Sequence, residues 1–145
     1  MNVVVDTIAP RLLGPSLMVA AAIIVKGYTD VGDGFSAGVI VALAISLRYI
    51  TLGPELTERS LPILRYAPVA TSVGMLIALG FGFAGVVAGE PPFTHHPGPG
   101  DDVVKIGTLE LITAVGFDIG LFLLVTGALV TLVHHLAHLV EEVGP

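Results

Sequence analysis

One acidic side chain lies inside an otherwise apolar stretch of this sequence, and it has the clearest capacity for chemistry. Asp118 follows Gly107 by eleven residues, within an apolar run long enough to cross a membrane. At about 1.5 Å per residue it would lie roughly 16 Å along a helix, near the middle of a bilayer. Placing an Asp there costs about 2.5–3.5 kcal/mol, so its side chain should face protein or a water-filled cavity. Two roles follow: a carboxylate that carries protons or Na⁺, or a structural hydrogen-bonding group between packed helices.

Two further polar residues precede Asp118 in the same run. Glu110 is expected in the first turn of this helix, where the helix dipole favours an acid near water. It lies about 80° around the helix from Asp118, so the two acids would flank one broad face without pairing. Thr113 lies between them and could hydrogen-bond within the membrane. Asp118, Glu110 and Thr113 are therefore the candidate residues of an ion path.

A glycine-rich segment follows the first apolar run. It contains Gly32, Asp33, Gly34 and Phe35, with Gly38 one turn further on. The spacing G-x-x-x-x-G-K-[ST] is missing, so a phosphate-binding loop is excluded. The segment is either a tight helix entry that uses glycine's freedom and small size, or a re-entrant element that shapes an ion path. We predict that these five residues form a structural or interface loop.

The histidines are too few to indicate a metal site. His134 and His138 are one helical turn apart, but two histidines without a third ligand make a weak zinc signal. We interpret them as cations near a helix C-terminus at the membrane surface. His95 and His96 are interpreted as solvated loop residues, with a pH-sensing role as the alternative. The sequence contains no Cys and no catalytic motif, so neither a metal, a cofactor nor an enzymatic activity is predicted.

The composition of the chain indicates a membrane protein. Of its 145 residues 54% are hydrophobic and only 12% are charged, whereas soluble domains have about 25% charged residues. A membrane-spanning helix needs about 20 mostly apolar residues. We therefore predict an all-α membrane protein, with one domain over residues 1–145. About four transmembrane helices are expected, at 8–25, 34–50, 67–89 and 107–133.

Charge indicates both the orientation and the partners. The predicted side with the two termini holds four arginines and the opposite side two lysines: Arg11, Arg48, Arg59 and Arg65 against Lys26 and Lys105. Positive residues prefer the cytoplasmic side, so both termini of this multi-pass protein are predicted in the cytoplasm. The formal net charge of -6 argues against nucleic acid as a partner, because phosphate binding needs clustered basic residues.

Three ordered motifs resemble those of the MnhB family, the B subunits of the Mrp-type antiporters. The segment Gly27–Gly38 resembles the family's G-x-x-x-P-G-G-G-F-x-x-G signature, although Val31 replaces its Pro and Asp33 one Gly. Residues Pro91–His95 are similar to its P-F-x-T-H loop. Residues Glu110–Gly120 are similar to its E-L-x-T-A-x-x-F-D-x-G segment. The resemblance thus covers nearly the whole chain.

The resemblance implies an accessory subunit of a hetero-oligomeric Mrp-type Na⁺/H⁺ antiporter in the cell membrane. Its partners would be the other antiporter subunits, Na⁺, H⁺ and lipids, with no cofactor. Such a subunit would help to build the complex and could line the Na⁺ or H⁺ path. Two alternatives remain open: the homologous subunit of an ion-translocating hydrogenase or related redox complex, and a membrane scaffold without ion contact.

Overall fold

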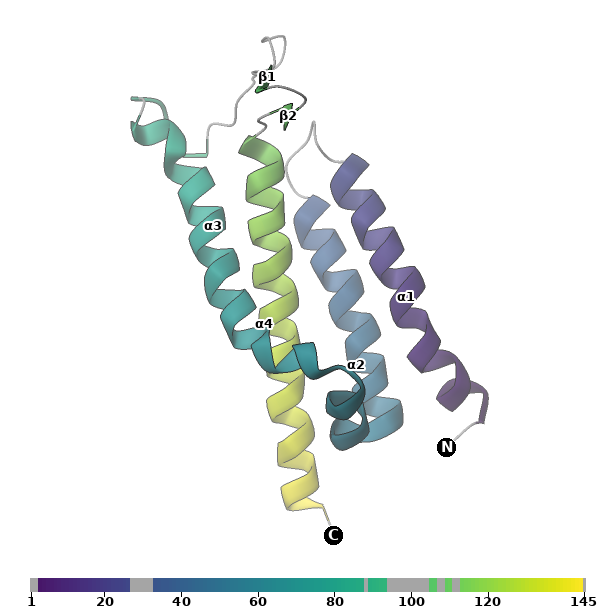
Figure 1. Cartoon of the computed structure of the whole chain (residues 1–145). Coiled ribbons are helices and arrows are strands. Elements are labelled where there is room, and N and C mark those ends of the chain that lie inside the picture. Colours follow the sequence, from purple (N-terminus) through teal and green to yellow (C-terminus); the bar gives the residue numbers. More distant parts are fainter. Residues whose placement is uncertain are drawn as a thin grey trace.

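The chain folds into long helices, and the prediction of about four helices is confirmed: four in the described residues are long and apolar enough to cross a membrane (Figure 1). The structure is a computed structural model that describes residues 3–26, 33–87, 89–93, 105–106, 109–110 and 113–144. Helix α1 is Val3–Lys26, α2 is Asp33–Ser60, η2 is the 3₁₀ turn Pro62–Tyr66, α3 is Ala67–Val87 and α4 is Thr113–Val143. Strands β1, Lys105–Ile106, and β2, Leu109–Glu110, form a small antiparallel pair. Gly32, His95 and His96 lie outside the described residues.

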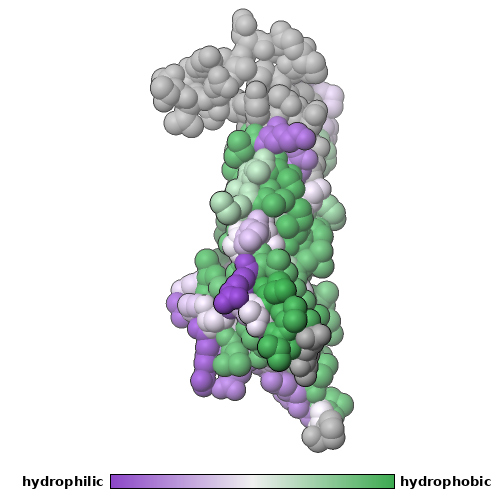
Figure 2. Space-filling model, turned by 90° about the vertical axis from the view of Figure 1, so that its right-hand side faces the viewer, coloured by the Kyte–Doolittle hydropathy of each residue, from purple (hydrophilic) through white to green (hydrophobic). Residues whose placement is uncertain are grey.

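The long helices lie side by side in the order α1, α2, α4, α3 (Figure 1). The fourth helix of the sequence therefore packs between the second and the third. This arrangement is close to a single layer, so many large apolar side chains remain exposed on the chain's surface. Figure 2 shows the side of the molecule on which α1 lies. This surface is largely hydrophobic, and its hydrophilic residues are concentrated in the lower half of the view and near the upper end of the helices. Exposed apolar surface of this extent is suited to lipid or to neighbouring membrane helices.

Small residues let α3 and α4 approach at backbone distance. A Cβ atom added at Gly74 would lie 2.4 Å from the backbone nitrogen of Leu124, and one at Gly120 would lie 2.6 Å from that of Ala78. Helix association in lipid gains little from the hydrophobic effect and depends on close packing, which such small residues permit. The α3–α4 contact is thus a contact between two backbones rather than between large side chains.

The chain reverses direction within α2, which differs from the predicted helix at 34–50. Gly53 has φ 78° and ψ 168°, outside helical geometry and in the region that favours glycine. Pro54 follows and starts a short return segment, Pro54–Ser60, that leads through η2 into α3 (Figure 1). The hydroxyl of the buried Thr57 donates a hydrogen bond of 3.0 Å to the carbonyl oxygen of Arg48, which holds the return segment against α2.

The predicted helix at 107–133 is shifted towards the C-terminus. Leu109–Glu110, predicted as helical, instead pairs in antiparallel register with Lys105–Ile106, and α4 begins at Thr113. Short apolar runs of this kind do not distinguish a strand from a helix by periodicity. At its other end α4 continues ten residues beyond the predicted boundary, to Val143. The boundaries of α1 and α3 differ less from prediction.

Candidate functional site

Asp118 is buried in the contact between α2 and α4, with 1% of its surface exposed. Because α4 begins at Thr113, Asp118 is in the second turn of the helix, roughly 7.5 Å from its start rather than 16 Å. It therefore lies near the end of the bundle at which α2 begins. The predicted distance was wrong because it was counted from Gly107, which precedes the helix.

The first turns of α2 rest directly on the backbone around Asp118. A Cβ atom at Gly34 would lie 2.0 Å from the carbonyl oxygen of Asp118, which is possible only because Gly34 has no side chain. One turn later, Gly38 faces Phe122 and Val125 of α4, and its carbonyl oxygen accepts a hydrogen bond of 3.4 Å from Thr126. The two glycines therefore determine how closely α2 can approach the segment that carries Asp118.

The other members of the predicted loop have different surroundings. Asp33 is the first residue of α2 and is partly exposed. Phe35 is 56% exposed, so no other part of the described chain buries its ring. An exposed aromatic side chain beside a tightly packed glycine contact is available to lipid or to a neighbouring subunit.

Aromatic rings pack beside Asp118 at the same end of the bundle. Phe93 follows α3 and lies against Gly82, whose carbonyl oxygen accepts a hydrogen bond from the backbone nitrogen of Phe93. Its ring centroid is 6.0 Å from that of Phe117 on α4 and 5.5 Å from that of Phe83 on α3. Such tilted and edge-on pairs are favourable arrangements for aromatic rings. Through these ring contacts Phe117, the sequence neighbour of Asp118, is connected to the end of α3.

The three ion-path candidates do not share one helix, contrary to prediction. Glu110 belongs to strand β2, in register with Lys105, and its side chain is outside what the structure describes. The 80° angle between Glu110 and Asp118 therefore does not apply. Thr113 is the first residue of α4 and is half-buried. Of the three, Asp118 is the acid that the structure places between two spanning helices.

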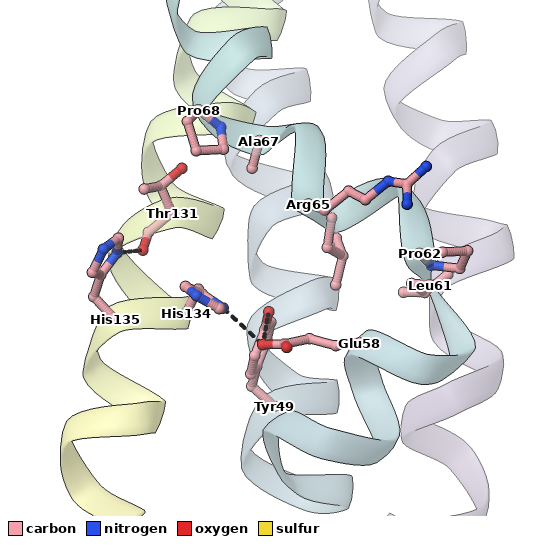
Figure 3. A pocket seen from close by; sticks show the side chains of 11 residues that line it. Tyr49, Glu58, Leu61, Pro62, Arg65, Ala67, Pro68, Thr131, His134 and His135 are labelled. Atoms are coloured by element: carbon pink, nitrogen blue, oxygen red, sulfur yellow. Dashed lines mark hydrogen bonds and ion pairs between the residues drawn. The ribbon is translucent and has the colours of Figure 1, made fainter. Parts of the chain in front are cut away.

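A second polar cluster, which sequence reasoning missed, lies at the opposite end of α2 (Figure 3). One carboxylate oxygen of Glu58, Oε1, is 2.7 Å from Nδ1 of His134 and 3.0 Å from Nε2 of His138. The hydroxyl of Tyr49 donates a hydrogen bond of 3.2 Å to the same oxygen. The spacing of the two histidines was visible in the sequence. Glu58 was not recognised, because only the return of the chain after Gly53 brings it to α4.

A buried arginine connects three segments near this second cluster. Arg48 of α2 donates hydrogen bonds to the carbonyl oxygen of Pro10 in α1, at 3.2 Å, and to the hydroxyl of Ser60 in the return segment, at 2.8 Å. Hydrogen bonds from a charged group are stronger than those between neutral groups. Arg48 therefore fixes α1 and the return segment against α2.

Comparison with known proteins relates this chain to antiporter subunits. Residues 4–131 match the family described as "Domain related to MnhB subunit of Na+/H+ antiporter". The chain is 31% identical to the Na(+)/H(+) antiporter B subunit of Alkalihalophilus pseudofirmus over 107 residues, which cover 74% of this chain and 72% of that protein. It is 32% identical to the Na(+)/H(+) antiporter B subunit of Bacillus subtilis over 117 residues, which cover 81% and 80%.

A third relative is much longer than this chain. The probable K(+)/H(+) antiporter A/B subunit of Rhizobium meliloti is 34% identical over 123 residues, which cover 83% of this chain. The match spans only 12% of that protein. These relatives thus carry names with two different cations, Na⁺ and K⁺.

Proposed function

This chain belongs to the family of MnhB-related domains, and we propose that it is an accessory subunit of a multi-subunit Na⁺/H⁺ antiporter in the cell membrane. The names of the three relatives support an antiporter rather than the hydrogenase alternative. The near-single layer of helices agrees with a subunit role, because both of its faces are left for lipid and for other subunits. On the charge asymmetry of the sequence, both termini lie in the cytoplasm.

We further propose that Asp118 is the residue through which this subunit takes part in ion movement. The observation that carries this proposal is the burial of its carboxylate, with 1% exposed, between two membrane-spanning helices. Acids in such positions are costly and commonly belong to proton or cation paths. With so little exposure, the carboxylate can exchange an ion only when the packing around it opens or when neighbouring subunits supply a path to it.

Substitution of Asp118 in the assembled complex tests this role. Asp118→Asn keeps the size and hydrogen-bonding capacity of the side chain but removes the charge. We expect normal assembly, with the rate of Na⁺/H⁺ exchange in membrane vesicles reduced at least tenfold, which corresponds to about 1.4 kcal/mol or more of added activation free energy. Asp118→Glu should retain part of the activity. Measuring each variant with Na⁺ and with K⁺ identifies the transported cation.

A matched control and one opposite outcome make the test decisive. Glu142→Gln removes an exposed acid from the same helix and should leave exchange unchanged. If Asp118→Asn assembles and transports like the wild type across pH, the ion-handling role is wrong. Loss of assembly in Asp118→Leu, together with full activity in Asp118→Asn, would instead assign Asp118 a structural hydrogen-bonding role.

A further inference from the structure

Two histidines and one glutamate converge at the end of the bundle where α2 reverses. His134 and His138 are one turn apart on α4 and therefore share one face. Glu58 comes from the return segment of α2 and reaches that same face. Figure 3 shows the Glu58 carboxylate and the His134 ring directed towards each other at the edge of a pocket of about 440 Å³.

The geometry of these three side chains is close to that of a metal site. One ring nitrogen of His134, one of His138 and a carboxylate oxygen of Glu58 all lie within 4.8 Å of one another. In tetrahedral zinc sites the bonds are about 2.0–2.1 Å, which places neighbouring ligand atoms about 3.3 Å apart. The two distances from Glu58, 2.7 and 3.0 Å, differ from that spacing by about 0.6 Å or less. To hold an ion, the carboxylate and the two rings would have to move apart by about 0.6 Å or less and direct their lone pairs at one centre.

The ligand types select the kind of ion. Two imidazoles and one carboxylate are the ligands of zinc sites that keep a fourth position for water. Imidazole nitrogen suits divalent transition metals, whereas Na⁺, Mg²⁺ and Ca²⁺ prefer oxygen ligands. The three side chains are between 32% and 43% exposed, so an ion can reach them from solution. This cluster is thus distinct in chemistry and position from the buried Asp118.

Neighbouring groups are placed to orient the ligands. Tyr49 donates a hydrogen bond to the Glu58 oxygen, and Nδ1 of His138 lies 3.7 Å from a carboxylate oxygen of Glu141, beyond hydrogen-bond distance but close enough for charge attraction. A carboxylate near the free nitrogen of a metal-binding histidine fixes the ring and makes it a better ligand. Arg65 also lines the pocket, but Figure 3 shows its guanidinium group directed away from Glu58, and it donates a hydrogen bond to Tyr66.

We propose that Glu58, His134 and His138 form a binding site for one divalent transition-metal ion, with Zn²⁺ the best match. The ion would join the return segment of α2 to the C-terminal part of α4. These two segments are far apart in sequence, and the contacts of Glu58 with His134 and His138 join them. The site would therefore strengthen a contact at one end of the bundle, independently of ion exchange at Asp118.

Zinc titration of the untagged full-length chain, first stripped with a chelator, tests the proposal. We expect one Zn²⁺ per chain by calorimetry, and an increase in the unfolding temperature when the ion is added. Co²⁺ in its place should give the visible absorption of a tetrahedral site. Glu58→Gln and His138→Ala should each weaken binding by more than the about 10–100-fold that loss of an outer partner costs. Glu58→Gln is nearly isosteric, so it also serves as the variant least disturbing to the fold.

Histidines outside the proposed ligand set provide the controls. His135 is the sequence neighbour of His134, but its Nδ1 lies 2.7 Å from the carbonyl oxygen of Thr131. His135→Ala, and a separate variant that replaces both His95 and His96 by Ala, should bind Zn²⁺ like the wild type. The proposal is wrong if no stoichiometric binding is seen, if Glu58→Gln and His138→Ala bind as tightly as the wild type, or if a control variant loses the ion equally. In each of these cases the cluster is a hydrogen-bond network without a metal.

Discussion

The contact between Gly34 and Asp118 permits a quantitative test with a single added methyl group. In Gly34→Ala, the new Cβ atom would lie 2.0 Å from the carbonyl oxygen of Asp118, whereas ordinary contacts begin at 3.4 Å. The opposing atom belongs to the backbone of a helix and cannot rotate away, so α2 and α4 must separate by about 1.4 Å. Overpacking of this kind typically costs about 1–3 kcal/mol, and occasionally more.

Alanine also stabilises helices relative to glycine, and this effect opposes the clash. The gain is at most about 1 kcal/mol in a helix interior and is smaller at Gly34, which is the second residue of α2. The clash should therefore dominate. Gly80→Ala is the matched control, because a Cβ atom at Gly80 of α3 meets nothing within 4 Å. That variant should be as stable as the wild type, or more stable by up to about 1 kcal/mol.

Thermal unfolding of the purified chain in detergent, and the yield of assembled complex, measure the difference. Gly34→Ala should unfold several degrees below the wild type, and Gly80→Ala at or above it. Gly34→Leu should impair assembly further, because it adds more atoms at the same contact. Equal unfolding temperatures and equal yields for Gly34→Ala and Gly80→Ala would refute the close packing of α2 on the backbone of α4.

Two further outcomes follow from the fold. Arg48→Ala should destabilise the chain by about 2–4 kcal/mol in thermal unfolding, because its charged hydrogen bonds to α1 and to the return segment are lost. Arg59→Ala breaks only an exposed ion pair and should change the stability by less than about 1 kcal/mol. Equal effects would contradict the bridging role of Arg48. The chain has no native cysteine, so single cysteines can report topology: Glu55→Cys and Glu142→Cys should react from the cytoplasm and Glu90→Cys from outside. Labelling of all three from one side would contradict the arrangement of the spans.

The number of spans could be predicted from the sequence, but the path of the chain between them could not. Each span is a run of about 20 apolar residues, which is a local property. The reversal at Gly53 also had a local signal, since Gly-Pro is a turn dipeptide. The position of the return segment had no local signal, because it depends on contacts of Thr57 and Ser60 with Arg48. The start of α4 was misplaced because a short apolar run before it pairs as strands.

The same distinction applies to the two polar sites. Asp118 stands out in any reading of the sequence, since an acid within an apolar run is costly. Glu58 does not, because it lies in a stretch with other charged residues that would be ordinary in a loop. Its contacts with Tyr49, His134 and His138 and its lower exposure separate it from its exposed neighbour Glu55, which pairs with Arg59. A site assembled from residues this far apart in sequence needs the three-dimensional path of the chain.

Because α4 lies between α2 and α3, the helices of this protein can complete their packing only after the last helix has been synthesised. During translation α1, α2 and α3 leave the ribosome before α4, yet the glycine faces of α2 and α3 pack against α4. Until α4 enters the bilayer, those faces are without their partner within the chain. A nascent chain that stops before Thr113 therefore lacks the helix against which both faces pack. Completion of the four-helix layer coincides with insertion of α4 between two spans already in the membrane.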